Sequence, residues 1–193
     1  MTHCFSRRSF LKGSAAAAAA LTSPLLPADA AFSETENGLF SPVSALCQTQ
    51  YGPVKGREGE NGQLCWYGIP YGAAPTGESR WTAPQEPARW LTVRDCTSPA
   101  PAAYQYTTFP LGTEDCLTLD IYSSAEAKKR PVLVYLHGSA ATGSSLELPG
   151  CELVRDAGSV FVALNYRLGL FGWNCRPALT ADPDATGNFA LLD

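Results

Sequence analysis

Two uninterrupted apolar runs in the second half of the chain predict buried strands. Residues 131–136 and 160–164 lack the polar alternation of a half-exposed strand, so both are expected to be covered on both faces. Between them, four apolar or small residues recur every three positions, which predicts a short helix: Leu148, Cys151, Val154 and Ala157. The separation of some twenty residues is long enough for a crossover connection. This half of the chain is therefore predicted to form a parallel β-α-β unit.

The preceding segments predict antiparallel strands. Residues 117–122 alternate apolar and polar side chains, which is typical of a half-buried strand. Residues 44–56 and 63–67 are expected to form a hairpin across a charged, glycine-rich turn. Residues 68–113 are rich in proline, show almost no periodicity, and predict a long irregular surface segment. The predicted fold class is α/β, with a mixed sheet that has antiparallel leading strands followed by the parallel β-α-β unit.

The first thirty-one residues indicate an export signal. Ser6–Lys12 matches the twin-arginine pattern S/T-R-R-x-F-L-K, and a weakly apolar, alanine-rich run follows over residues 13–26. Small residues in Pro27–Ala31 offer an A-x-A cleavage site. The run is shorter than the roughly 18–20 residues that span a bilayer, so no stable membrane anchor is expected. We expect a signal peptide at 1–31, a domain at 32–193, and a bacterial periplasmic or secreted protein that engages the twin-arginine export machinery.

Composition narrows the remaining classes of function. A hydrophobic fraction of 45% argues against a disordered chain, and a formal net charge of −4 argues against nucleic-acid binding. Six cysteines follow the expected cleavage site, without a C-x-x-C pair and with His137 as the one histidine, so we expect no metal and no cofactor. An even cysteine count in an exported chain favours disulfides, although six cysteines allow 15 pairings. Twin-arginine export carries folded proteins, so any disulfide would form after export.

The segment His137–Ser145 follows a predicted buried strand and is the main candidate for chemistry. Loops at the carboxyl ends of parallel strands are where α/β folds bind ligands. A phosphate-binding loop is one interpretation, but Ser144 replaces its lysine and a Pro-Gly pair interrupts the helix that should follow. An oxyanion loop with backbone N–H donors is the second interpretation, and an ordinary turn of small residues is the third.

Several motifs, taken in order, resemble the type B carboxylesterase and cholinesterase family of α/β-hydrolases. Each is weak alone, but their order and spacing match the family throughout the chain after the signal. The matching segments are Tyr51–Gly56, Tyr67–Gly72, Arg80–Trp81, Glu114–Ile121, Pro131–Gly138, Asn165–Gly172, Gly187–Asn188 and Leu191–Asp193. The resemblance implies the amino-terminal part of an α/β-hydrolase fold and an ester substrate for the whole enzyme.

The resemblance also implies roles for individual residues. The family's H-G-G-G-[FY] is here His137-Gly138-Ser139-Ala140-Ala141, so the oxyanion-hole backbone is expected at Gly138, Ser139 and Ala140. Backbone donors survive this change, whereas the glycine-type φ angles are harder to keep.

Two structural pairings are implied as well. Arg80 and Glu114 match an ion pair that ties the irregular segment to the sheet, and Cys116 matches the second cysteine of a family disulfide, with Cys96 as its candidate partner. Cys151 with Cys175 and Cys47 with Cys65 are weaker pairings.

The parts needed for ester hydrolysis are incomplete in this sequence. Serine esterases use a nucleophilic serine, a histidine base and an orienting carboxylate. The chain has no G-x-S-x-G, His137 precedes the oxyanion loop, and Asp193 matches the aspartate that opens the helix before the nucleophile strand. We expect an amino-terminal fragment of an exported carboxylic-ester hydrolase that is inactive alone. A non-catalytic binding protein of the same family and a degraded product without function are the alternatives.

Overall fold

The structure is a computed structural model that describes residues 45–59, 62–125, 130–148, 150–174 and 187–193. The expected signal peptide at 1–31 and the pairing of Cys151 with Cys175 lie outside these residues. Within the described ranges, no helix has both the length and the apolar character needed to cross a membrane.

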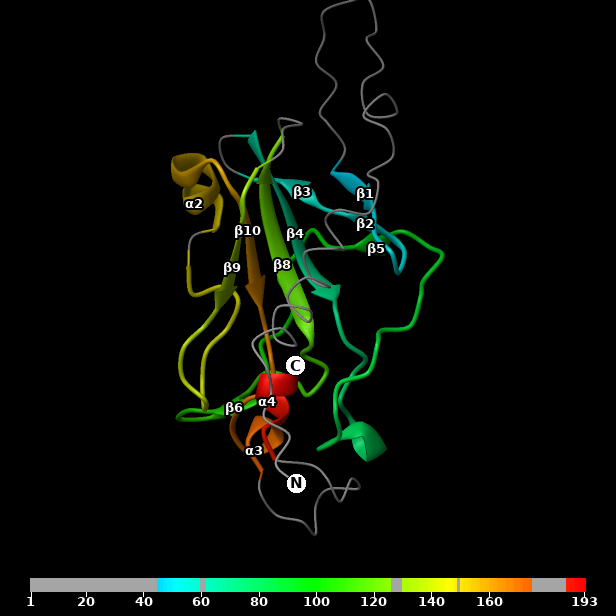
Figure 1. The fold of residues 1–193 in the computed structure, drawn as a ribbon, viewed down its shortest axis with the longest axis vertical. Helices are drawn as coiled ribbons and strands as arrows, with labels where there is room; N and C mark the ends of the chain where they lie inside the picture. Colours follow the sequence, from blue (N-terminus) through cyan, green and yellow to red (C-terminus); the bar gives the residue numbers. More distant parts are fainter. Residues whose placement is uncertain (1–44, 60–61, 126–129, 149, 175–186) are drawn as a thin grey trace, which may run out of the picture.

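A mixed sheet forms the centre of the described structure. Its strands lie in the order β3-β4-β8-β10-β9, with β10 parallel to β9 and the other neighbours antiparallel (Figure 1). The strands are β3 (Arg57–Glu58), β4 (Gln63–Pro70), β8 (Thr118–Ser124), β9 (Val132–Leu136) and β10 (Val160–Leu164). The predicted mixed sheet, antiparallel first and parallel later, is confirmed.

Helix α2 (Gly150–Ala157) connects the two parallel strands β9 and β10. It packs on β8, β10 and β4, and its inward residue Val154 is 2% exposed. The apolar period of three in the sequence therefore marks a real crossover helix, and the predicted β-α-β unit is confirmed.

The expected hairpin between residues 44–56 and 63–67 is only partly correct. Residues 45–56 turn back on themselves, because the Thr49 hydroxyl accepts hydrogen bonds from the N–H groups of Tyr51 and Gly52 at 3.2 and 3.1 Å. Their strands β1 (Leu46–Gln48) and β2 (Pro53–Lys55) form a small separate sheet with β5 (Arg94–Asp95). Only the short strand β3 pairs with β4 across the glycine-rich turn.

The segment 68–113 is largely irregular, as expected. Its regular pieces, and those that follow β10, are short: η3 (Gly77–Ser79), β6 (Gln105–Tyr106), β7 (Pro110–Leu111), α3 (Gly169–Gly172) and α4 (Phe189–Leu192). In Figure 1, α3, α4 and β6 gather beyond the end of the sheet to which β10 points.

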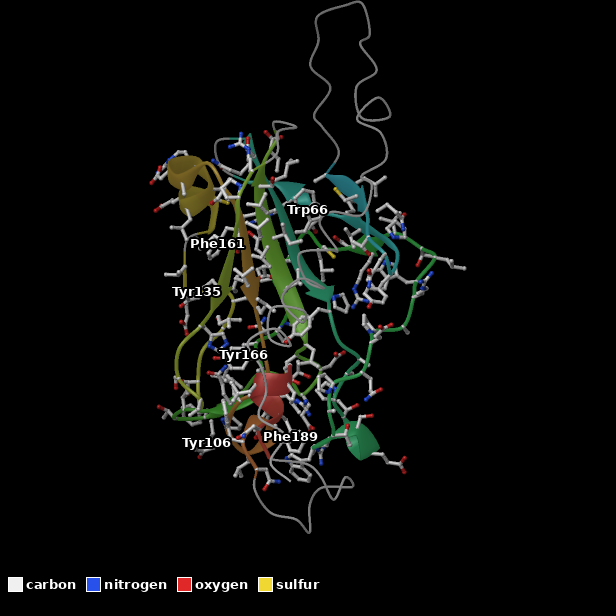
Figure 2. The ribbon with its side chains drawn as sticks, in the orientation of Figure 1. Trp66, Tyr106, Tyr135, Phe161, Tyr166 and Phe189 are labelled. Atoms are coloured by element: carbon white, nitrogen blue, oxygen red, sulfur yellow. The ribbon has the colours of Figure 1, made fainter. Side chains whose placement is uncertain are left out.

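Apolar side chains cover both faces of the central sheet. One face packs toward α2, and Figure 2 shows Phe161 and Tyr135 on that side, with Trp66 toward β1 and β2. The α2 side holds Cys65, Tyr67, Tyr122, Val154, Phe161 and Ala163. The opposite side holds Ala45, Val54, Trp66, Ile69, Cys96, Leu119, Val162 and Leu164. The sheet is therefore the middle layer of three.

Strand β9 departs from the prediction that it is covered on both faces. It stands at the edge of the sheet, paired on one side with β10, and Leu136 is 56% exposed. Val132, Leu133 and Val134 are 40–47% exposed as well, so among the described residues both faces of this strand are only partly covered. An uninterrupted apolar run indicates burial, but it does not say which segments provide the cover.

Strand β8 departs from the prediction in the opposite sense, because its polar positions are buried too. Asp120 is 1% exposed. One carboxylate oxygen accepts the N–H of Gly68 at 2.8 Å, and the other accepts the Ser145 hydroxyl at 2.6 Å. Burial raises the pKa of Asp120, and these two hydrogen bonds oppose the rise. The alternating pattern predicted a half-buried strand, whereas β8 is a central strand covered on both faces.

The raised pKa of Asp120 predicts a pH-dependent stability. The folded state holds the Asp120 proton more tightly than the unfolded chain does, so its contribution to stability falls as pH rises from about 3.9 through the raised value. The Asp120→Asn variant removes this titration and also replaces one accepting oxygen with an N–H donor. Its melting temperature minus that of the parent is expected to be a few degrees more positive at pH 7 than at pH 4, because the cost of the lost acceptor is the same at both pH values. Thermal unfolding followed by circular dichroism at both pH values measures this.

The exposed Asp115→Asn variant is the matched control, because it removes the same charge without touching the buried network. A pH profile of Asp120→Asn that runs parallel to that of the parent would contradict the assignment.

Candidate functional site

The candidate loop leaves the carboxyl end of β9 and runs from His137 to Ser145. Beside it, β10 ends at Leu164 and continues into Asn165 and Tyr166. Parallel strands place their carboxyl ends at one edge of a sheet, which is where open α/β folds position ligand-binding loops. The loop predicted from sequence to carry chemistry therefore lies at the expected edge.

His137 anchors the start of the loop. Its ring is 3% exposed and stacks on the ring of Tyr166, with centroids 4.3 Å apart and planes 14° apart. The Tyr166 hydroxyl donates a hydrogen bond to the His137 carbonyl oxygen. Burial raises the pKa of Tyr166, which keeps the hydroxyl protonated for that bond at neutral pH. The Tyr166 hydroxyl also lies 3.4 Å from Nδ1 of His137. Among the described residues no serine hydroxyl or cysteine thiol hydrogen-bonds to the ring, so its observed role is to hold the loop.

Ser139 adopts a backbone conformation that normally favours glycine. Its φ is +68°, in the left-handed region. Its own hydroxyl stabilises the turn, because Oγ accepts from the N–H groups of Ala141 and Thr142, each at 3.3 Å. A side-chain hydrogen bond to nearby backbone is a common way for serine to form turns. The glycine-type angle is therefore present at this position without glycine.

Two backbone donors of the loop are open. Among the hydrogen bonds of the described residues, none uses the N–H of Ser139 or of Ala140, and both residues are exposed. A Cβ placed on the neighbouring Gly138 would meet nothing within 4 Å, so the space beside these donors is also open. This arrangement can accept an anionic oxygen.

The middle of the loop is held from two other segments. The Ala140 carbonyl oxygen accepts the N–H of Gly169, the first residue of α3, at 2.7 Å. Gln105 in β6 bonds both backbone groups of Gly143: its amide nitrogen donates to the carbonyl at 2.9 Å, and its oxygen accepts the N–H at 3.0 Å. Glycine is required at position 143, because a Cβ there would lie 2.3 Å from Nδ1 of His137 and would clash with it.

The end of the loop is fixed to the sheet through Ser145. The Asn165 side chain accepts the Ser145 N–H at 2.8 Å and donates to the Ser145 hydroxyl at 3.0 Å, while that hydroxyl donates to Asp120. Sequence reasoning did not identify Gln105, Asn165 or Asp120 as positioning residues. The sequence offered a signal for two of them: Asn165 is a polar residue directly after a buried strand, and Asp120 is a polar residue within one.

A buried ion pair joins the same region to α4. Arg167 and Asp193 are almost completely buried, and Nε of Arg167 donates to the two carboxylate oxygens at 2.8 and 3.1 Å. A further guanidinium nitrogen donates to the carbonyl of Thr82 at 2.9 Å, and the Arg167 guanidinium lies over the Phe189 ring. Asp193 thus closes α4 onto the end of β10, a role that sequence reasoning did not assign to it.

Arg80 and Glu114 form a two-point ion pair near the surface. Nε and a terminal nitrogen of Arg80 lie 2.5 and 2.7 Å from the two carboxylate oxygens of Glu114. The Arg80 guanidinium also lies over the rings of Trp81 and Phe171, which stack on each other. The pair connects the segment after η3 with the lead into β8.

The expected disulfide between Cys96 and Cys116 is not formed. Both are free thiols, and they lie in different apolar clusters, Cys96 between the sheet and β2 and Cys116 beside Leu168. Burial raises the pKa of Cys96 to about 11 and that of Cys116 to about 12. Cys47 and Cys65 are free thiols as well, so that weaker pairing is also absent.

The geometry separates the three interpretations of the loop. No helix begins directly after Gly143, and α2 starts only at Gly150, so the helix amino terminus of a phosphate loop is missing. An ordinary turn of small residues does not explain why other segments hold the loop at four points while two adjacent backbone N–H groups stay unused. Within the described residues no group of three or more His, Cys, Asp or Glu side chains could hold a metal ion. The loop therefore lacks the main feature of a phosphate loop and presents two unused backbone donors.

Comparison with known proteins matches two regions of the chain. Residues 43–193 match the model of the carboxylesterase family, and residues 4–24 match the twin-arginine translocation signal. The signal indicates export to the periplasm or secretion through the twin-arginine machinery.

Individual relatives show how much of the family this chain spans. It is 39% identical to a para-nitrobenzyl esterase of Bacillus subtilis over 66% of this chain and 28% of the relative, and 35% identical to a fumonisin B1 esterase of Sphingopyxis macrogoltabida over 75% and 29%. A carboxylesterase structure from Geobacillus stearothermophilus superposes with a TM-score of 0.69 at 35% identity, covering 77% of this chain and 32% of that one.

The chain therefore spans less than a third of the length of these relatives. The mixed sheet is the amino-terminal part of their α/β-hydrolase fold. With the family model matched over 151 consecutive positions, 43–193, the chain belongs to the type B carboxylesterase family.

Proposed function

We propose that this chain supplies the oxyanion-hole backbone of an exported serine esterase that hydrolyses carboxylic esters. The observation that carries the proposal is the pair of unused N–H groups at Ser139 and Ala140, held at the carboxyl edge of the sheet. An ester substrate follows from family membership, and export follows from the twin-arginine signal.

The chemistry assigned to the loop is stabilisation of negative charge. When a serine attacks an ester carbonyl, the carbonyl oxygen becomes an oxyanion, and fixed N–H donors stabilise it without reorganising during the reaction. The anchors at Tyr166, Gln105 and Asn165 serve this role, because they fix the loop from outside and leave its donors free. In this proposal the nucleophile, the acid and the histidine base come from parts of the whole protein that this chain does not include.

The 193-residue chain alone is predicted to be inactive. It contains no G-x-S-x-G elbow, and no serine or cysteine among the described residues hydrogen-bonds to His137. We expect no hydrolysis of p-nitrophenyl acetate above a buffer blank. Turnover by the purified chain that is abolished by a serine-directed phosphonate would overturn this prediction, whereas inactivity of the whole protein would favour the non-catalytic binding alternative.

In the whole protein, the Ala140→Pro variant tests the donor directly. Proline has no backbone N–H, so this variant removes one of the two donors and is expected to lower kcat for p-nitrophenyl acetate by about 10²–10³-fold. The Ala140→Gly variant keeps the N–H and is expected to remain within a few-fold of the parent.

Ala141→Pro is the control for loop disruption, because it removes the N–H that donates to the Ser139 hydroxyl but neither proposed donor, and it is expected to lose less activity than Ala140→Pro. Circular dichroism and the melting temperature establish that each variant is folded. Equal losses in the two proline variants would show that loop disruption, and not donor removal, accounts for the effect.

A further inference from the structure

Two cysteines that are 86 positions apart in the chain meet on the α2 side of the sheet. Sγ of Cys65 in β4 lies 3.3 Å from Sγ of Cys151 in the first turn of α2. Cys65 is fully buried and Cys151 is half-buried. No other cysteine pair among the described residues has its sulfur atoms in hydrogen-bonding contact.

The surroundings of the two sulfur atoms fit closely around them. Gly59 covers the pair: a Cβ at that position would lie 2.9 Å from Sγ of Cys65 and 3.1 Å from Sγ of Cys151. The guanidinium of Arg57 lies over the Tyr67 ring, 5.3 Å from its centroid, and is close enough to both thiols to interact electrostatically. A positive charge beside a thiol favours the thiolate that disulfide exchange requires.

We propose that Cys65 and Cys151 form a disulfide after export. Twin-arginine export delivers the folded chain to a compartment where disulfides persist, so the fold brings the two sulfur atoms together before an oxidant is available. A disulfide requires a sulfur separation of about 2.05 Å, so closure needs an approach of about 1 Å, within reach of side-chain rotation. This pairing excludes both weaker pairings expected from the sequence, Cys47 with Cys65 and Cys151 with Cys175.

The oxidant in this step is a dithiol–disulfide oxidoreductase in its disulfide form. The more accessible Cys151 thiolate attacks one sulfur of that disulfide, which gives a mixed disulfide and releases the other oxidant sulfur as a thiolate. The Cys65 thiolate then attacks Sγ of Cys151, the new S–S bond forms, and the oxidant leaves as a dithiol. The pair loses two electrons to the oxidant, and its two protons pass to water or to the departing thiolates. Burial raises the pKa of Cys65 to about 12, so the second attack is the slow step at neutral pH.

The consequence is a covalent link between the crossover helix and the antiparallel half of the sheet. Only non-covalent packing otherwise holds α2 to β4. Closing so long a loop restricts the unfolded chain strongly, and the expected rise in melting temperature is roughly 10 °C.

The test compares the exported chain with a chain retained in the cytoplasm by changing Arg7→Lys and Arg8→Lys. Free thiols are blocked with iodoacetamide, and peptides are mapped by mass spectrometry without reduction. We expect a linked Cys65–Cys151 peptide in the exported chain and alkylated cysteines in the retained chain. Dithiothreitol is expected to lower the melting temperature of the exported chain by roughly 10 °C.

Three variants keep the proposal falsifiable. Cys151→Ser is expected to abolish both the linked peptide and the effect of dithiothreitol, whereas Cys47→Ser, a half-buried cysteine in β1, changes neither. Cys65→Ser is expected to behave like Cys151→Ser. If Cys65→Ser fails to fold, the purified parent is treated with oxidised glutathione instead, and the same linked peptide is expected. Alkylation of both thiols in the folded exported chain, or a link from Cys151 to Cys175, would overturn the proposal. None of these measurements depends on ester hydrolysis.

Discussion

The burial of polar side chains at the carboxyl edge of the sheet is the constraint on which the rest of the described structure depends. Asp120, Asn165 and Arg167 are each no more than 2% exposed, and a buried polar group without a partner is costly. Each therefore requires partners from other segments, and those partners are Gly68, Ser145, Thr82 and Asp193. Satisfying these few groups draws β4, the loop, the irregular segment and α4 to one place.

The same requirement explains how the loop keeps its backbone shape without the usual glycines. The loop is held from outside by Tyr166, Gln105 and Asn165, so its shape depends only in part on its own residues. Ser139 accepts a left-handed φ because its hydroxyl bonds the turn that follows. A backbone site that is fixed by its surroundings tolerates a change of side chain as long as the N–H groups remain.

Sequence patterns identified the strands and the crossover helix well, because apolar periodicity reports directly on which side chains avoid water. Sequence patterns did not predict which segments pack against each strand. The uncovered edge at β9, the second small sheet and the covered polar face of β8 all depend on what packs against a strand, and no local pattern carries that information. The cysteines show the same limit: the family resemblance implied Cys96 with Cys116, whereas the fold brings together Cys65 and Cys151.

By itself the sequence determined the export signal, the order of the main strands along the chain, the α/β class and the position of the loop that follows β9. Each of these features depends on residues close together in the chain, either as a short motif or as a regular spacing of apolar side chains. Only the tertiary structure decided that Asp120 is buried, that Gln105 and Asn165 hold the loop, and which two sulfur atoms are in contact. These contacts join residues between 20 and 86 positions apart, so they arise only when the sheet and its crossover have formed.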